Sequence, residues 1–530
     1  MSEINMTKSN MAKAILKAYR LGQEDEALEP IVAFGPSQKP EGRMAGGDYV
    51  IFYDIRGERE IQITRSLTEE NFSEFPVKKD SLLNFVTMIE YSSDLPVKVA
   101  FPPEDTVKNT LTEVLTRSGW RVDKISESEK AIHVSYFMNG KNENLFPGEE
   151  KIIVPSPESV ASFADKPEMS ASKVADAVIS SLDKPGKRVT IANFANVDVV
   201  GHTENREAVI KAVETVDKQL GRIMACCRER GITLVVTADH GTVEEWLYPD
   251  GQINTGHTGN PVPLVLADFS QKRSSSLSQE GELAQVAPTV LDLMEIEAPA
   301  EMEGPSLLTN HSRKFQKREK LLLLILDGWG LRREKTGNLI AAAATPNFDV
   351  LWKSYPGSEL KASGEAVGMP PHTVGNSESG HLHLGTGRRI LLDRVRIDRA
   401  IEDGTFFENE AFVWAMDEAQ KNRKPLHLMG IVSHYSSHGT IDHLFALLRM
   451  ARDRGLPEVY VHSLIGRRGE KPESGAAYVE KVEETCRTLK TGRVVTVMGR
   501  YWALDREENW DRVEKAYQAL VQGEGTQIPI

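Results

Sequence analysis

Acidic and imidazole side chains follow apolar runs at several points of this 530-residue chain. Asp198 and His202 are four residues apart, so on a helical turn they would share one face and could bind one ion. Asp239 and His240 are adjacent, and because neighbouring side chains diverge, this pair would reach one ion from a tight turn. Both spacings also occur in surface pairs, so neither identifies a metal site by itself.

Two further side chains extend this group. His257 lies in a glycine-rich loop before an apolar run, and Asp327 follows another. The group offers oxygen and nitrogen donors without thiolate, which fits Mn²⁺, Zn²⁺ or Mg²⁺ better than an iron–sulfur cluster or a structural zinc. Six or seven such ligands suffice for two ions, which could activate a nucleophile and neutralise a transferring phosphoryl group. Alternatively, His257 is a structural histidine.

A candidate nucleophile, Ser377, lies in the sequence VGNSESGH. This is not the G-x-S-x-G elbow, because Ser379 occupies the position of its second glycine. A serine hydroxyl is a poor nucleophile at neutral pH, and metal coordination is one way to lower its pKa. The alternative is a helix start in which Ser377 is the N-cap.

Short apolar runs alternate with amphipathic helical stretches, and these elements must position the polar groups. Helical periodicity is clear in residues 207–228. The alternation predicts an α/β fold with mostly parallel sheets covered by helices on both faces. In such sheets ligands bind beyond the carboxyl ends of the strands, so we expect a shared site there, although one such aspartate could merely cap a helix. The predicted strands are Arg188–Ala192, Thr233–Thr237, Val262–Ala267, Leu321–Leu326, Leu426–Ile431, Val459–His462 and Val494–Met498.

The composition excludes several classes of function. The net charge of −13 disfavours nucleic-acid binding, although a small anionic substrate could still bind a locally positive pocket. Three cysteines make no disulfide framework and suit a reducing cytoplasm. We see no signal peptide and no apolar run near the roughly 20 residues of a membrane span. The length favours two or more domains. Together with the preceding features, we expect a cytoplasmic protein without a membrane partner.

Several long motifs resemble those of the cofactor-independent phosphoglycerate mutases, which belong to the alkaline phosphatase superfamily. They include LLILDGWG, VGNSESGHLHLGTGRR, NFANVDVVGHT, TADHGTVEEW and NTGHTGNPVP, and the resemblance covers nearly the whole chain. The resemblance implies a glycolytic isomerase that interconverts 3-phosphoglycerate and 2-phosphoglycerate through a phosphoserine. It also implies a monomer that binds two divalent ions and does not use 2,3-bisphosphoglycerate. Mn²⁺ is the first candidate for these ions, and Mg²⁺, Zn²⁺ and Co²⁺ are the alternatives.

The order of the motifs differs from that of the family. There the DGWG strand lies near the start and ADHG near the end, whereas here the second part of the pattern precedes the first. The resemblance therefore implies a circular permutation in which a linker, residues 309–320, joins the former termini. It implies a contiguous phosphatase-like metal-binding domain, residues 97–391, and a transferase domain for substrate binding in two segments, residues 1–96 and 392–530.

The resemblance also assigns roles to single residues. Ser377 would accept the phosphoryl group, Lys130 would neutralise it, and Arg468 would also be catalytic. One ion would be held by Asp198, His202 and His257, and the other by Asp327, Asp239, His240 and Ser377. The substrate contacts would be Arg56, Arg59, Lys130, His438, Arg468, Arg500 and Arg506, since guanidinium groups bind phosphate and carboxylate in a bidentate manner.

The acceptor loop departs from the family pattern. D-G-R-D is replaced by the sequence from Gly466 to Gly469, so both aspartates are missing, and the second is the expected base or orienter for the substrate hydroxyl. Loss of a positioned base costs about 10²–10⁴-fold in rate, and His434 or Glu470 could substitute. Two alternatives therefore stand beside the mutase: a phosphatase or mutase of another phosphorylated small acid, and a catalytically inactive binding protein.

Overall fold

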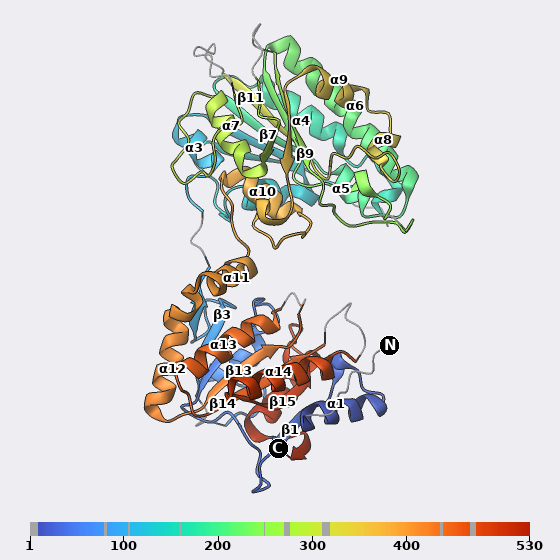
Figure 1. Ribbon diagram of the computed structural model, residues 1–530. Helices are drawn as coiled ribbons and strands as arrows, with labels where there is room; N and C mark the ends of the chain where they lie inside the picture. The colour runs from blue at the N-terminus through green and yellow to red at the C-terminus, as the bar shows by residue number, and fades with distance from the viewer. Residues whose placement is uncertain are drawn as a thin grey trace. The chain divides into compact units, whose positions relative to one another are not determined.

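The computed structural model describes residues 9–78, 82–103, 107–157, 162–248, 250–269, 276–309, 319–434, 438–466 and 473–529. The chain divides into two compact units, which are described separately: unit 1 contains residues 1–103 and 393–530, and unit 2 contains residues 104–392. Each unit holds one mostly parallel sheet with helices packed against it (Figure 1). The predicted α/β fold class is confirmed.

Among the described residues of unit 2, eight strands form one sheet in the order β10-β12-β9-β8-β11-β7-β5-β6. Only β9 runs antiparallel to its neighbours β8 and β12. The strands are β5 (Arg121–Glu127), β6 (Glu149–Val154), β7 (Arg188–Phe194), β8 (Thr233–Thr237), β9 (Val262–Asp268), β10 (Glu280–Glu282), β11 (Lys320–Leu326) and β12 (Gly357–Lys361).

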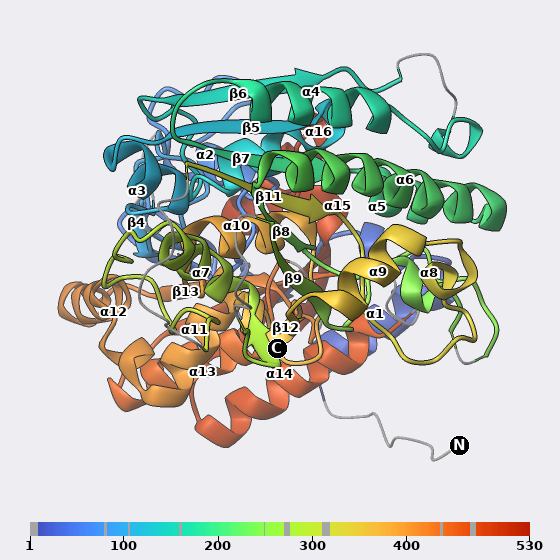
Figure 2. The ribbon, with the colours of Figure 1, turned by 90° about the horizontal axis from the view of Figure 1, so that it is seen from above.

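Helices cover both faces of this sheet, with α4 and α6 side by side on one face and α3, α7 and α10 on the other (Figure 2). Helix α6 ends at Gly231, which adopts the left-handed conformation that glycine tolerates best. The helices of unit 2 are α3 (Leu111–Arg117), α4 (Ala171–Asp183), α5 (Asn196–Gly201), α6 (Arg206–Arg230), α7 (Val286–Leu293), α8 (Leu339–Ala342), α9 (Pro346–Ser354) and α10 (Ser377–Thr386).

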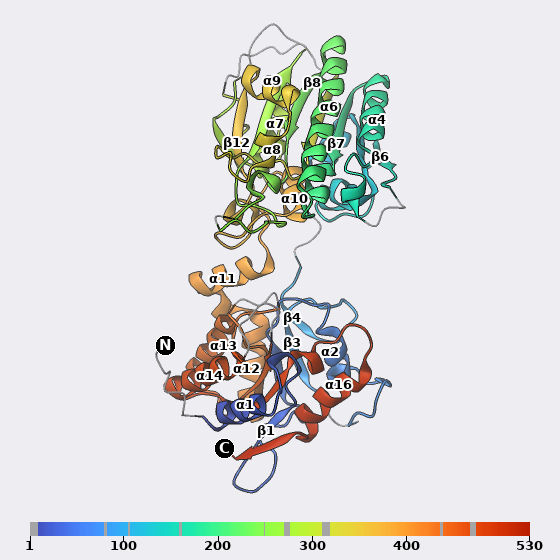
Figure 3. The same cartoon turned by 90° about the vertical axis from the view of Figure 1, so that its right-hand side faces the viewer.

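The described part of unit 1 also forms an eight-stranded sheet, in the order β16-β1-β15-β14-β13-β2-β3-β4. Its one antiparallel pairing joins β1 to β15. The strands are β1 (Ile31–Phe34), β2 (Tyr49–Phe52), β3 (Asn84–Ile89), β4 (Lys98–Phe101), β13 (Leu426–Ile431), β14 (Val459–Ile465), β15 (Arg493–Gly499) and β16 (Thr526–Pro529). The helices are α1 (Asn10–Arg20), α2 (Ile61–Thr68), α11 (Asp393–Asp403), α12 (Glu410–Asn422), α13 (Ile441–Asp453), α14 (Gly475–Leu489), α15 (Arg500–Ala503) and α16 (Trp510–Tyr517), and Figure 3 gives a second view of them.

All seven predicted strands occur, because continuous apolar runs are typical of parallel strands that are buried on both faces. The six residues Leu321–Leu326 are fully buried in the core of unit 2. Most of the predicted linker, residues 309–320, lies outside the described residues. Among the described helices, none combines the length and apolarity needed to cross a bilayer.

Candidate metal centre

The predicted metal ligands of unit 2 converge because the strands that carry them end at one edge of the sheet. In the parallel register Leu326 of β11 pairs with Phe194 of β7, and Ile325 pairs with Thr237 of β8. The segments that follow these strands therefore leave the sheet side by side. Since β9 is antiparallel, its amino-terminal end lies at the same edge, which brings in the loop that carries His257.

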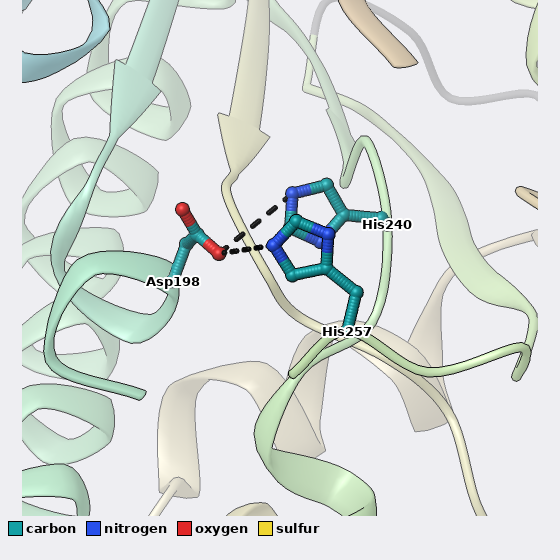
Figure 4. A group of neighbouring side chains, drawn as sticks. All are labelled: Asp198, His240 and His257. Atoms are coloured by element: carbon teal, nitrogen blue, oxygen red, sulfur yellow. Dashed lines mark ion pairs between the residues drawn. The ribbon is translucent and has the colours of Figure 1, made fainter. Parts of the chain in front are cut away.

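The first group of ligands surrounds the Asp198 carboxylate on helix α5. The Nε2 atoms of His202 and His257 lie 3.3 and 3.2 Å from Asp198 Oδ1. His240 Nε2 lies 3.8 Å from the same oxygen, and its ring stacks on that of His257 with centroids 3.9 Å apart (Figure 4). The structure thus brings together the three residues predicted for one ion and adds His240 to them.

The second group surrounds Asp327, which directly follows β11. His240 Nε2 lies 3.6 Å from Asp327 Oδ1 and 3.4 Å from Asp239 Oδ2, between the two groups. His381 of α10, which the sequence analysis did not predict, lies with Nδ1 3.2 Å from Asp239 Oδ2. Asp239, Asp327 and His381 have donor atoms close enough to hold one ion, and so do Asp198, His240 and His257.

Ser377 and Lys130 lie at the centre of this cluster. Lys130 Nζ is 2.6 Å from Ser377 Oγ, 2.6 Å from Asp198 Oδ2 and 2.8 Å from Asp327 Oδ1. The Ser377 hydroxyl is also 3.0 Å from His240 Nε2. Ser377 is the first residue of α10, and the helix is capped by Asn376, whose side chain accepts a hydrogen bond from the Ser379 amide. The alternative in which Ser377 is the N-cap is therefore wrong, and its hydroxyl faces the cluster instead.

Strong electrostatic coupling follows from the burial of these groups. Burial disfavours the ionised Asp198, but Lys130 and then His202 outweigh it and hold the pKa of this carboxyl well below its usual range. Burial also opposes the charge on Lys130, yet Asp327 and Asp198 raise the pKa of its ammonium group. Burial, followed by repulsion from Asp239, raises the pKa of Asp327. Three carboxylates thus share one ammonium ion, which leaves the cluster electrostatically suited to a further cation.

The imidazole orientations fit a bound metal. His202 Nδ1 lies 2.7 Å from the Thr255 carbonyl and His257 Nδ1 lies 2.8 Å from that of Gly375, so each Nδ1–H has a backbone acceptor and each Nε2 faces Asp198. This arrangement of an imidazole between a carbonyl and a metal is the usual one in metalloproteins. Within the described residues, His257 Nε2 and Asp239 Oδ2 are buried without a hydrogen-bond partner. The donor set therefore fits divalent metal ions.

Two polar residues that the sequence analysis missed support the cluster. Asn193, at the end of β7, donates to Asp327 Oδ2 at 2.7 Å, and its side chain lies 3.0 Å from His381 Nε2. Glu244 is fully buried, and its carboxylate accepts from the Thr242 amide at 2.9 Å, from the Thr258 hydroxyl, and from Asn260 at 3.0 Å.

Glu244 joins the segments that carry the ligands. Thr242 follows the Asp239–His240 turn and Thr258 follows His257. A Cβ atom built on Gly330, in the turn after Asp327, would lie only 2.2 Å from the Glu244 carboxyl carbon. One carboxylate thus fixes the spacing of three ligand segments. Of the three residues that the sequence analysis missed, only His381 was detectable from the sequence, because it lies four residues after Ser377 and hence on the same helix face.

The predicted substrate-binding arginines belong to unit 1, where three of the described ones pair with carboxylates and the Arg59 side chain donates to the Leu504 carbonyl at 3.2 Å. Arg56 and Arg506 contact the two oxygens of Glu58 at 3.2 and 2.9 Å, and Arg500 contacts Glu26 at 2.8 Å. Burial lowers the pKa of His438, and the nearby charges of Arg500, Arg56 and Arg59 lower it further. These four predicted residues therefore share one neighbourhood. Arg468 lies outside the described residues, as do Gly469 and Glu470.

The fold and the cluster define a metal-binding α/β protein. The chain belongs to the metalloenzyme superfamily, whose family model matches residues 4–298. A second model, described as the N-terminus of the BPG-independent PGAM proteins, matches residues 397–529.

Curated relatives carry the name 2,3-bisphosphoglycerate-independent phosphoglycerate mutase. The protein of Moorella thermoacetica is 43% identical over 301 residues, which are 57% of each chain. One from Methanosarcina acetivorans is 38% identical over 305 residues, 57% of this chain and 58% of the relative. One from Clostridium perfringens is 47% identical over 208 residues, 39% of this chain and 41% of the relative. The predicted family resemblance is confirmed, although the chain spans less than three fifths of the length of these relatives.

A solved structure of Leishmania mexicana phosphoglycerate mutase at low cobalt concentration is 30% identical in sequence and covers 52% of this chain and 53% of its own. Its TM-score is 0.37.

Proposed function

We propose that this chain is a metal-dependent phosphoglycerate mutase that interconverts 3-phosphoglycerate and 2-phosphoglycerate through a phosphoserine at Ser377. The position of the Ser377 hydroxyl carries the proposal, because it lies in contact with Lys130 and His240 at the centre of the buried cluster. The names of the relatives support the substrate and do not favour the phosphatase or the inactive binding protein.

The proposed site would hold two divalent ions. Mn²⁺ is the first candidate, and Mg²⁺, Zn²⁺ and Co²⁺ are the alternatives. One set of ligands is Asp198, His202 and His257, and the other is Asp327, Asp239, His240 and Ser377. Bound there, the ions would lower the pKa of the serine hydroxyl and neutralise charge on the transferring phosphoryl group. Oxygen and imidazole donors without thiolate support this choice of metals.

The chain's own residues orient the phosphate and balance its charge. The Lys130 ammonium ion lies 2.6 Å from Ser377 Oγ, where it neutralises the incoming phosphoryl oxygens. Ser377 opens helix α10, and the amino-terminal end of a helix favours a phosphate group. Arg56, Arg59, Arg500 and Arg506 bind the carboxylate and phosphate of the substrate together with His438, and Arg468 remains a predicted contact.

We further propose that the chain is circularly permuted relative to its family. A family model described as an N-terminus matches the C-terminal residues 397–529, which supports this order. The side chain of Asn10 in α1 donates to the Pro529 carbonyl in β16 at 3.0 Å, so these two segments lie side by side. Unit 2 would then correspond to the phosphatase-like domain and unit 1 to the transferase domain. We also propose that the protein is a cytoplasmic monomer and that it does not use 2,3-bisphosphoglycerate.

The test is a product analysis of the full chain with Mn²⁺. We expect 2-phosphoglycerate to form from 3-phosphoglycerate with little free phosphate, as measured by mass spectrometry with a phosphate assay alongside. Ser377→Ala should abolish this isomerisation, and a phosphorylated peptide that contains Ser377 should be found only in the wild type. Release of phosphate in excess of isomer formation would instead indicate a phosphatase, and absence of both products would contradict the proposal.

A further inference from the structure

A cavity of unit 2 has no part in the proposed reaction. Its volume is about 550 Å³, and it is lined by residues of the segment before helix α4, of the start of α4 and of the first half of α6. Helices α4 and α6 lie side by side on one face of the sheet (Figure 2). The described residues that line the cavity include no member of the metal cluster. A cavity of this size is typical of binding sites for small molecules.

The lining of this cavity is basic in an otherwise acidic protein. Four lysines and two glutamates line it, which gives the lining a net charge of +2, whereas the whole chain carries −13. Lys166, Lys173 and Lys218 are exposed and form no ion pair within the described residues. Three ammonium groups are therefore available to an anion that enters the cavity.

The two glutamates of the lining already have other donors. Glu168 Oε1 lies 3.8 Å from Nζ of Lys211, the fourth lysine. Glu214 Oε1 accepts from the Ala344 amide at 3.2 Å. Neither carboxylate thus neutralises the other three lysines by a direct contact.

Two buried polar groups in the wall of the cavity have no acceptor. Thr215 and Gln219 are 8% and 5% exposed, and because they are four residues apart they share one face of α6. Arg222 Nη1 donates to Gln219 Oε1 at 2.8 Å, which orients the amide and leaves its Nε2 as a donor. Within the described residues, neither this Nε2 nor the Thr215 hydroxyl donates to an acceptor. Buried donors of native proteins are normally satisfied, so these two indicate an acceptor that enters the cavity.

We propose that this cavity is a binding site for a small phosphorylated anion. The three unpaired lysines would balance its charge, and Thr215 and Gln219 would donate directed hydrogen bonds to its oxygens. A phosphate monoester offers three acceptor oxygens and up to about two negative charges, whereas a carboxylate offers two oxygens and one charge. Phosphate therefore suits the five donors of the lining better. The inference goes beyond the proposed mutase function and does not depend on it.

The test measures the reactivity of the lysines themselves. The metal-loaded full chain is acetylated with an N-hydroxysuccinimide ester in the presence and absence of inorganic phosphate or 3-phosphoglycerate, and mass spectrometry gives the labelling rates of Lys173 and Lys218. Lys353 of α9 is the internal control, because it is exposed in the same unit and forms no ion pair within the described residues. Since each lysine is measured separately, an anion bound at the metal cluster does not contribute to these two rates.

We expect both probes to slow the acetylation of Lys173 and Lys218 in a saturable manner, about fivefold where about four fifths of the cavities are occupied, and to leave Lys353 unchanged. Chloride at the same ionic strength and succinate at the same concentration should have little effect. Tighter binding of 3-phosphoglycerate than of inorganic phosphate would identify the ligand as an organic phosphate, and the reverse order as the free ion. Equal slowing by chloride or succinate, or no slowing by either phosphate compound, would overturn the inference.

Two variants test the buried donors. Thr215→Val removes the hydroxyl at nearly constant shape, and Gln219→Glu keeps an acceptor for Arg222 but replaces the donor. The phosphate concentration at half-saturation should rise at least about tenfold in each variant.

Thr112→Val is the matched control, because Thr112 is a fully buried threonine of α3 whose hydroxyl also lacks a partner within the described residues. It lies outside the cavity lining, so its replacement should leave phosphate binding unchanged. Melting temperatures show whether each variant is folded, and if one is not, the other decides. Phosphate binding as tight as in the wild type by the folded variants of Thr215 and Gln219 would contradict the proposed site.

Discussion

The predicted metal site of unit 2 and the predicted substrate arginines of unit 1 hold their charged groups in opposite ways. In unit 2, Lys130 and its partners Asp198 and Asp327 have side chains that are 4%, 5% and 0% exposed. In unit 1, the arginine–glutamate pairs are largely open to solvent, with Arg56 and Glu58 at 42% and 52%. Desolvated charges interact strongly and tolerate no missing partner, whereas exposed pairs are screened and contribute little.

This difference in exposure suits the two proposed roles, which are metal binding in unit 2 and substrate binding in unit 1. The buried cluster has more carboxylates than ammonium ions and attracts cations, while the exposed arginines can exchange a glutamate for a substrate anion at little cost. Arg500 stands between these cases, since its side chain is 11% exposed and that of its partner Glu26 is 46% exposed.

The largest expected effect tests the buried side of the comparison. Lys130→Met should lower the rate of isomerisation by about 10²–10⁴-fold, the range seen when a single stabilising or proton-transferring group is removed. It should also destabilise the metal-free protein by about 3–5 kcal/mol, because Asp198 and Asp327 lose a buried partner. Thermal unfolding with a chelator and with Mn²⁺ measures this, and the metal-loaded protein should be affected less.

Lys184→Met serves as the control for that measurement, since Lys184 also contacts two carboxylates but its side chain is 32% exposed. Equal destabilisation of the Lys130 variant with and without metal would break the comparison, because the lysine would then not act in place of a cation.

The next effect tests Arg500, whose exposure lies between the two cases. Arg500→Lys should lower kcat/KM for 3-phosphoglycerate by about 10–100-fold, because an ammonium group cannot reproduce the bidentate geometry of a guanidinium. Steady-state kinetics with 3-phosphoglycerate check this. Arg493→Lys is the control, because Arg493 begins strand β15, which Arg500 directly follows, and pairs with Glu41. The melting temperature should hardly change, and a large drop in it would assign Arg500 a structural role.

The smallest expected effect sharpens the account of the metal cluster. Glu244→Gln keeps the size of the side chain but weakens its bonds to the Thr242, Thr258 and Asn260 donors, so the affinity for Mn²⁺ should fall about tenfold. Isothermal titration of the metal-free protein measures this directly. Glu245→Gln, which alters the neighbouring bond to Asn260 at 3.0 Å, should leave the affinity near that of the wild type. Equal affinities for Mn²⁺ in the two variants would show that Glu244 does not support the metal ligands.

Much of the fold was predictable because its signals are local. Apolar runs such as Leu321–Leu326 are long enough to specify buried strands, and the period of residues 207–228 specifies a helix. The ligand candidates were predictable for a related reason. Polar residues directly after parallel strands meet at one edge of the sheet whatever the rest of the chain does, and Asp239 and Asp327 follow this rule.

The sequence by itself therefore determined the α/β class, the strands and which side chains could meet at the sheet edge. Only the tertiary structure decided which atoms face one another: the contact of His381 with Asp239, the links from Glu244 to three segments, and the pairing of Glu60 with His438. Glu60 and His438 are 378 positions apart, and no local pattern encodes a contact of that separation. Such pairings result from the packing of whole elements, which also sets the burial that shifts their pKa values.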